Sequence, residues 1–186
     1  MINISLKEFK NIHKKKINQV IYSSLIVKNE NFLINLINNF LKVKNSFVFE
    51  SVEKGKIRGR YTIFGKDPDK IWEFNNNKAY SISAKKKKII NGHPEKIIEK
   101  IIENFKFKIP KNLPPISSMI SGYFSYDIIR YIEKIPNNCV NDLNIPDVRL
   151  FRPIKLIIYD NFKKKIFFII NCFKDQKISN YNKKFN

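Results

Sequence analysis

The chain has 186 residues, of which 43% are hydrophobic and 13% aromatic, and its formal net charge is +20. This length suits one medium-sized domain, and the apolar content excludes a disordered chain. The charge alone favours a polyanionic partner. However, only five of the 36 basic residues are Arg, and Arg is the residue suited to bidentate contacts with bases and phosphates. We therefore expect no nucleic-acid partner.

Apolar periodicity and turn residues predict the elements in chain order. We expect strands at 19–27, 46–52, 57–65, 71–74, 78–83, 117–125, 149–161 and 165–173. We expect helices from Asn29 or Asn31 to about Val43, at 93–105, and from about Ser125 to Lys134. Turns are predicted at 67–70 and 75–77, and loops at 109–115 and 137–147. Strands outnumber helices and short turns join most neighbours, so the predicted fold class is α+β with a mainly antiparallel sheet and a few packed helices.

The same patterns divide the chain into three parts. We expect an N-terminal extension at 1–18, one domain at 19–173, and a polar, frayed tail at 174–186. There is no secretory signal and no apolar stretch long enough for a membrane helix, so we expect a cytoplasmic protein without a membrane partner.

Motifs for catalysis or metal binding are not found in the sequence. The cysteines and histidines are isolated, which argues against a zinc site or a disulfide: Cys139, Cys172, His13 and His93. Phosphate-binding and nucleophile motifs are also missing. Four acids stand in Pro-containing turns, where we expect them to cap the turn: Asp67, Asp69, Asp142 and Asp147.

The densest group of charged and hydroxyl side chains lies in FVFESVEKGKIRGRYTIFG, residues 47–65. It consists of Glu50, Ser51, Glu53, Arg58 and Arg60. With a tight turn at Lys54–Gly55, Ser51 would lie across from the strand that carries the arginines. The group is then either a surface ion-pair ladder or a small site for a zwitterion, with acid and hydroxyl for an ammonium and Arg for a carboxylate.

Several ordered motifs between about Gln19 and Ile170 resemble anthranilate synthase component I. FVFESVEKGKIRGRYTIFGKDPDKIW is similar to the LLESVE, GRYS and DPD motifs near the start of that family. LPPISSMISGYFSYDIIRYIEKIP resembles its LPP and GY-x-x-YD segment, and LNIPDVRLFRPIKLIIYDNFKKKIFFI its PD, RP and FDH strand pair.

The resemblance implies an N-terminal regulatory and scaffold region that is not catalytic on its own. The family's chorismate-binding catalytic domain, with its magnesium-holding glutamates, has no match, so we expect no catalytic residue, metal site or cofactor in this chain. A complete enzyme of the family uses ammonia from its glutamine amidotransferase, component II, to convert chorismate to anthranilate and pyruvate. The implied partners are therefore the C-terminal catalytic half and component II.

The resemblance also implies a feedback site for the effector L-tryptophan. Its Glu-Ser motif corresponds to Glu50 and Ser51, and Arg60 is the candidate for the basic residue on the following strand. The related aminodeoxychorismate synthase component I of the folate pathway is a competing hypothesis, although the Glu-Ser pair, GRYTIFG and DPDKIW favour the anthranilate branch. Two more distant hypotheses are a stand-alone amino-acid-binding regulatory module and a basic nucleic-acid-binding protein.

Overall fold

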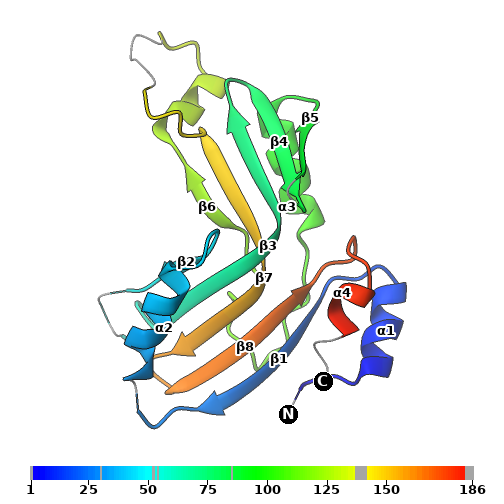
Figure 1. Ribbon diagram of the computed structural model, residues 1–186, viewed down its shortest axis with the longest axis vertical. Coiled ribbons are helices and arrows are strands. Elements are labelled where there is room, and N and C mark those ends of the chain that lie inside the picture. The colour runs from blue at the N-terminus through cyan, green and yellow to red at the C-terminus, as the bar shows by residue number, and fades with distance from the viewer. Residues whose placement is uncertain are drawn as a thin grey trace. The chain divides into compact units, whose positions relative to one another are not determined.

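The computed structural model describes residues 2–29, 31–51, 53, 55–84, 86–136 and 142–182 (Figure 1). The chain forms two compact units. Unit 1 comprises Met1–Asp67, Phe107–Met119 and Pro153–Asn186, and unit 2 comprises Pro68–Lys106 and Ile120–Arg152.

Antiparallel strands make up most of both units. The strands are β1 Gln19–Ile26, β2 Phe47–Phe49, β3 Tyr61–Asn75, β4 Lys78–Ser83, β5 Lys86–Ile90, β6 Ser121–Phe124, β7 Val148–Asp160 and β8 Lys165–Cys172. In unit 1 the neighbours run in the order β1-β8-β7-β3, and β2 pairs with β3. In unit 2, β4 lies between β3 and the edge strand β5, and β6 pairs with β7. The predicted α+β class with a mainly antiparallel sheet is confirmed.

In unit 1, strands β7 and β8 carry apolar side chains on both faces. Successive side chains of a strand point to opposite sides, so neighbouring apolar residues pack into different clusters. On one face, Leu156, Ile158, Phe167 and Ile169 form a cluster with Leu113 from the 107–119 segment. On the other face, Tyr159 and Ile166 pack with Leu33 and Phe40 of α2 (Phe32–Leu41). Covering both faces in this way buries strands that read as continuous apolar runs.

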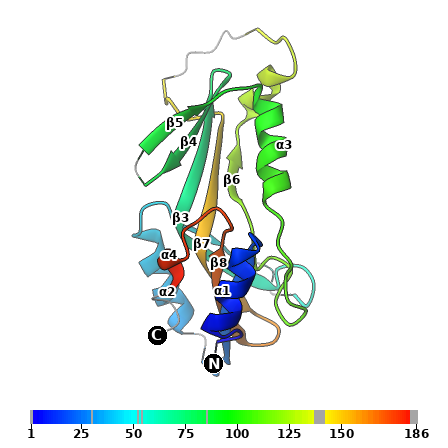
Figure 2. The ribbon, with the colours of Figure 1, turned by 90° about the vertical axis from the view of Figure 1, so that its right-hand side faces the viewer.

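The two ends of the described chain also pack into unit 1. Helix α1 (Leu6–Lys14) begins with a capping box between Ser5 and Glu8, and Figures 1 and 2 show it beside α4 (Ser179–Asn182). The rings of Phe9 and Tyr181, both fully buried, meet edge to face with centroids 5.9 Å apart. The last described segment is therefore docked through Tyr181, and our expectation of a frayed tail is wrong for that segment.

Unit 2 has its core between α3 (Pro94–Asn104) and one face of the sheet (Figure 2). Ile97 and Ile101 of α3 contact the buried Trp72, Phe74 and Ala79. The helix begins with Pro at its first turn and Glu95 after it, as predicted, since neither the missing Pro N–H nor an acid is unfavourable there.

Several predicted elements differ from the structure. Residues 67–70 do not form a turn: β3 continues through them, with Asp67 in the left-handed region at φ +53°. The predicted helix after Ser125 is a short 3₁₀ helix, η1 (Tyr126–Tyr131), and the strand before it begins only at Ser121. Strand β5 is not among the predicted strands: three of its five residues are lysines, which are less frequent in strands than β-branched and aromatic residues.

Lysines on β5 fit the position of this strand at the edge of the sheet. Lys86, Lys87 and Lys88 are exposed, and charge on an edge strand discourages pairing with another chain. At β1, the other end of the strand order, Asn3 takes the place of a pairing strand. Its backbone N–H donates to the carbonyl of Tyr22 at 3.1 Å, and its side-chain oxygen accepts from the Tyr22 N–H at 2.7 Å.

Candidate functional site

The hairpin that carries the predicted effector residues is more open than expected. Its strands pair from Phe47↔Gly65 to Phe49↔Ile63, so the connection runs from residue 50 to residue 60. The prediction that a tight turn at Lys54–Gly55 joins the two strands is therefore wrong, because the connecting segment is much longer. Lys54 itself lies outside the described residues. A turn further along joins the Gly55 N–H to the Arg58 carbonyl at 3.0 Å.

Arg60 is held by Asp160 at the end of β7. Its Nε and Nη2 donate to the two carboxylate oxygens at 3.0 and 2.6 Å, and the Asp160 side chain is only 2% exposed. The guanidinium also lies over the ring of Tyr61 at 5.0 Å from its centroid. Asp160 therefore orients Arg60, and Nη1 has no acceptor among the residues that the structure describes.

The hydrogen bonds between Arg60 and Asp160 shift the pKa of each group in the direction that favours its charged form. Burial would raise the pKa of the Asp160 carboxyl, but hydrogen bonds from Arg60 and from the backbone N–H groups of Lys163 and Phe162 outweigh burial and lower it. The hydrogen bonds to Asp160 in turn raise the pKa of Arg60. Both groups are therefore charged at neutral pH, and the geometry of Arg60 is fixed by a neighbour 100 positions away.

Ser51 lies next to the residue that precedes Arg60. A Cβ atom at Gly59 would be 2.8 Å from Ser51 Oγ and would overlap the carbonyl oxygen of Glu53, and Gly59 has φ +63°. Only glycine adopts this conformation readily without a steric penalty. The loop thus brings Ser51 close to the Arg60 backbone, while Glu50 is exposed on the same loop.

The interpretation of this group as an ion-pair ladder is wrong for the residues that the structure describes. Glu50, Ser51 and Arg60 form no hydrogen bond or ion pair with one another there, and Arg58 is exposed. The structure assigns the arginine to Asp160 and leaves the acid and the hydroxyl without a protein partner in the described part of the chain.

Three of the acids expected to cap turns instead bind side chains of other segments. Asp69 accepts two hydrogen bonds from Arg152 at 2.8 and 2.5 Å, in a pair whose side chains are 7% and 10% exposed. Asp67 pairs with Lys155 at 2.7 Å, and both side chains are nearly half exposed.

Asp147 also makes a contact that turn capping does not describe. It accepts from the hydroxyl of Tyr131 at 2.5 Å, and burial and this hydrogen bond raise the pKa of Tyr131. The Asp147 carboxylate additionally accepts the backbone N–H of Asn76 at 3.2 Å. Asp142, the fourth acid, is exposed.

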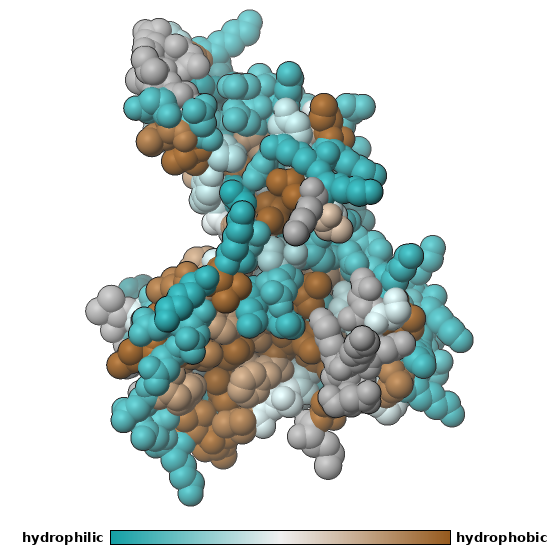
Figure 3. Space-filling model, viewed as in Figure 1, coloured by the Kyte–Doolittle hydropathy of each residue, from teal (hydrophilic) through white to brown (hydrophobic). Residues whose placement is uncertain are grey.

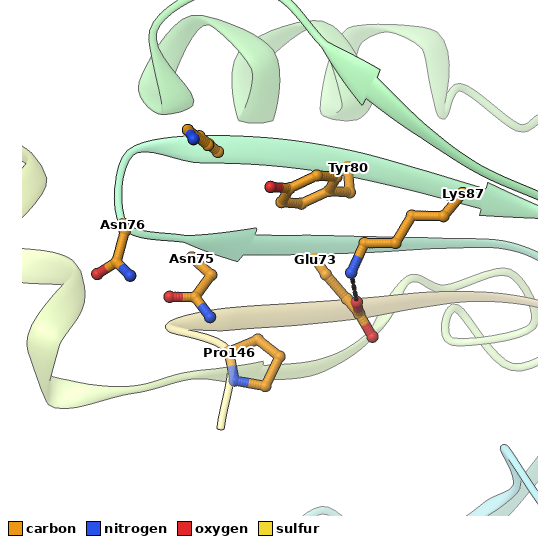
Figure 4. Close-up of a pocket in the computed structure, with 7 residues that line it drawn as sticks. Glu73, Asn75, Asn76, Tyr80, Lys87 and Pro146 are labelled. Atoms are coloured by element: carbon orange, nitrogen blue, oxygen red, sulfur yellow. Dashed lines mark hydrogen bonds and ion pairs between the residues drawn. The ribbon is translucent and has the colours of Figure 1, made fainter. Parts of the chain in front are cut away.

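A polar pocket of about 320 Å³ lies within unit 2 (Figure 4). It is lined by Glu73, Asn75, Asn76, Lys78, Tyr80, Lys87 and Pro146. Lys87 Nζ is 3.0 Å from the Glu73 carboxylate and 4.3 Å from the centroid of the Tyr80 ring. Sequence reasoning missed this site, although the alternation of polar residues at 73, 75, 78 and 80 predicts that they share one sheet face.

Metal-binding clusters and membrane-spanning helices are both missing from the described ranges. No group of three or more His, Cys, Asp or Glu side chains there could hold a metal ion. No helix of these ranges is long and apolar enough to cross a membrane. The prediction for Cys139 lies outside the described residues, while Cys172 is fully buried and forms no disulfide among the residues that the structure describes.

Comparison with known proteins finds bacterial and plant anthranilate synthase chains that are similar to this one. The chain is 34% identical over 139 residues to anthranilate synthase component 1 of Acetivibrio thermocellus, which covers 74% of this chain and 28% of the relative. It is 29% identical over 167 residues to that of Cereibacter sphaeroides, covering 87% and 33%. The chloroplastic anthranilate synthase alpha subunit 1 of Oryza sativa subsp. indica is 33% identical over 131 residues, covering 64% and 23%. No family model matches the sequence.

A solved structure agrees in fold. Anthranilate synthase component I from Streptococcus pneumoniae TIGR4 superposes with a TM-score of 0.57 at 18% identity, covering 86% of this chain and 34% of that chain. The chain thus spans about a third or less of the length of these relatives.

Proposed function

Because this chain is homologous to anthranilate synthase component I, we propose that it corresponds to the N-terminal regulatory and scaffold region of such an enzyme, in tryptophan biosynthesis. In this proposal, the conversion of chorismate and ammonia to anthranilate and pyruvate belongs to a catalytic region that this chain does not match. The proposed location is the cytoplasm.

The proposed regulatory role is the binding of L-tryptophan as an effector by Glu50, Ser51 and Arg60. The observation that carries it is the geometry of Arg60: Asp160 orients the guanidinium, and Nη1, which has no acceptor among the described residues, would donate to a ligand carboxylate. An exposed carboxylate and a hydroxyl on the same loop suit the ammonium of an amino acid. A ligand that uses these groups gains charge-assisted hydrogen bonds without reorganising Arg60.

The proposed scaffold role is supported by apolar side chains left exposed on unit 1. Leu25 is 50% exposed and Phe168 is 40% exposed, and the β1–β8 register places them on one face. Figure 3 shows apolar side chains gathered over β7 and β8 on the face turned to the viewer. Surfaces of this kind usually bind another protein region, and the partners we propose are the C-terminal catalytic half and the glutamine amidotransferase, component II.

Magnesium is proposed only for the catalytic region. The described residues of this chain contain no cluster of three acidic, His or Cys side chains, and Mg²⁺ is normally held by carboxylates together with substrate oxygens. The residues present here therefore do not fit that ion, and no step through it is derived from them.

Calorimetric titration with L-tryptophan tests the effector site. It is carried out on the full chain, alone and with the catalytic region of a component I relative added in trans. We expect binding in the mixture to weaken at least about tenfold in Arg60→Gln and Ser51→Ala, the loss of one or two charge-assisted hydrogen bonds.

Arg58→Gln is the matched control, because Arg58 is an exposed arginine of the same loop. Its affinity should stay within about twofold of the parent chain, as expected for a side chain that does not touch the ligand. Tight binding by the chain alone that survives Ser51→Ala would contradict the proposed site.

A further inference from the structure

The pocket of unit 2 has a composition that suits one class of small molecule. We propose that it binds a small polyhydroxylated anion, a sugar acid or a sugar phosphate. This inference is independent of the proposed effector site, whose residues Glu50, Ser51 and Arg60 belong to unit 1. Its volume of about 320 Å³ lies within the range of small-molecule sites.

Charge favours an anion. The only acid lining the pocket, Glu73, is 3.0 Å from Lys87 and 3.5 Å from Arg149, so two cations already neutralise it. Lys78 is a further, exposed cation in the lining. The Asp147 carboxylate accepts the Asn76 N–H beside the pocket, so three cations face two carboxylates, and the net positive charge attracts a negatively charged group and repels a cation.

Hydrogen bonding favours hydroxyl groups. The side-chain oxygen of Asn75 is buried and has no hydrogen-bond partner among the described residues, which is uncommon for a buried acceptor. A hydroxyl donor from a ligand would satisfy it, and the exposed Asn76 amide can both donate and accept. The cross-strand pair Asn75↔Lys78 allows one ligand to reach the acceptor and the cation together.

Tyr80 and Pro146 give the pocket apolar surface that can contact the C–H groups of a ligand's carbon skeleton. Figure 4 shows Glu73 and Asn75 on the same side of β3, with Pro146 beside Asn75. Tyr80 is paired directly across from Glu73 on β4, and its ring already accepts a cation contact from Lys87. An aromatic ring and a proline next to amide and charged groups can contact both the C–H and the hydroxyl faces of a polyol.

The probe is D-gluconate, compared with two molecules that each lack one of its features. Sorbitol has the same six-carbon chain of hydroxyls without the charge, and acetate has the charge without the hydroxyls. Titrations of the isotope-labelled full chain are followed by the NMR amide signals of Asn75, Asn76 and Tyr80. We expect gluconate to bind at least about fivefold more tightly than either, because each lacks a hydrogen-bonded or charged contact. D-Glucose 6-phosphate is the second anionic arm, and the tighter of the two anions identifies the natural anionic group.

Two variants locate the binding. Lys78→Gln should weaken gluconate binding several-fold and bring its affinity close to that of sorbitol. Lys88→Gln is the matched control: it removes the same charge from an exposed position whose side chain lies on the opposite sheet face, across from Ser81. Asn75→Ala should weaken gluconate but leave acetate binding unchanged.

The proposal is overturned if both anions bind no better than sorbitol and acetate. Equal weakening by Lys88→Gln and Lys78→Gln would overturn it as well, because attraction by net charge alone predicts that result. None of these measurements depends on L-tryptophan, so the effector proposal stands or fails separately.

Discussion

Breaking the buried ion pair between Asp69 and Arg152 should strongly destabilise unit 2. The guanidinium Nε and Nη2 donate to the two carboxylate oxygens at 2.8 and 2.5 Å, and the side chains are 7% and 10% exposed. Arg152→Met keeps much of the aliphatic volume but leaves the Asp69 charge buried without its guanidinium. Removing one partner of such a pair costs about 3–5 kcal/mol of unfolding free energy.

Urea unfolding followed by tryptophan fluorescence measures this cost. Trp72 is the single tryptophan of the chain and is 8% exposed in the core of unit 2, so its emission reports on that unit. Lys96→Met is the control, because Lys96 pairs with Glu99 at 3.0 Å in the same unit, but the two side chains are 64% and 50% exposed. An exposed pair is worth at most about 1 kcal/mol.

The double variant Asp69→Leu/Arg152→Met tests whether the stability lost in Arg152→Met comes from the unpaired buried charge of Asp69. Since apolar replacement of a whole buried pair is often nearly neutral, it should recover most of the stability lost in Arg152→Met. A loss below about 1 kcal/mol in Arg152→Met, or a double variant as unstable as the single one, would refute the reasoning.

Three further predictions concern unit 1. Because the pKa of Asp160 is lowered in the folded state, its ionised carboxylate contributes fully to stability above the unfolded carboxyl pKa of about 3.9. This contribution is lost as pH falls through the lower folded pKa. Asp160→Asn should remove this acid dependence in urea titrations from pH 3 to 7. Gly59→Ala should displace the loop at Glu53 and abolish L-tryptophan binding in calorimetry, because φ +63° and the overlap are both unfavourable; unchanged binding would contradict the site. Tyr181→Ala should cost about 3–5 kcal/mol of unfolding free energy and speed hydrogen exchange around Phe9; unchanged exchange would show that the Tyr181 ring is not docked against Phe9.

Elements with local signals could be predicted from the sequence. The turn between β3 and β4 has Asn76 and Asn77 at φ +49° and +60°, and Asn tolerates that region better than most residues. The helix α3 has a Pro at its start and an isoleucine stripe, of which Ile97 and Ile101 are buried. In each of these elements the residues that decide the structure are close together in the sequence.

Elements that depend on distant partners could not be predicted in this way. Asp67 and Pro68 are typical turn residues, but pairing of β3 with its neighbours keeps the strand continuous through them. The partner of Arg60 is 100 positions away, so composition and spacing could place the arginine on the hairpin but not assign it to Asp160. The predicted site residues therefore gained a geometry from the structure, while their ligand remains a prediction.

The structure separates motifs that maintain the fold from those that can support function. The DPD and RP motifs are linked by one ion pair between β3 and β7, Asp69 with Arg152 in unit 2, and Asp67 of DPD pairs with Lys155 of β7 in unit 1. Pro68 and Pro153 have no N–H to donate to the backbone hydrogen bonds between strands. The ion pairs beside these prolines supply cross-strand contacts there. These motifs have a structural explanation that needs no ligand. Glu50 and Ser51 have no such explanation among the described residues, so a test of regulation should be made by substitutions in that loop.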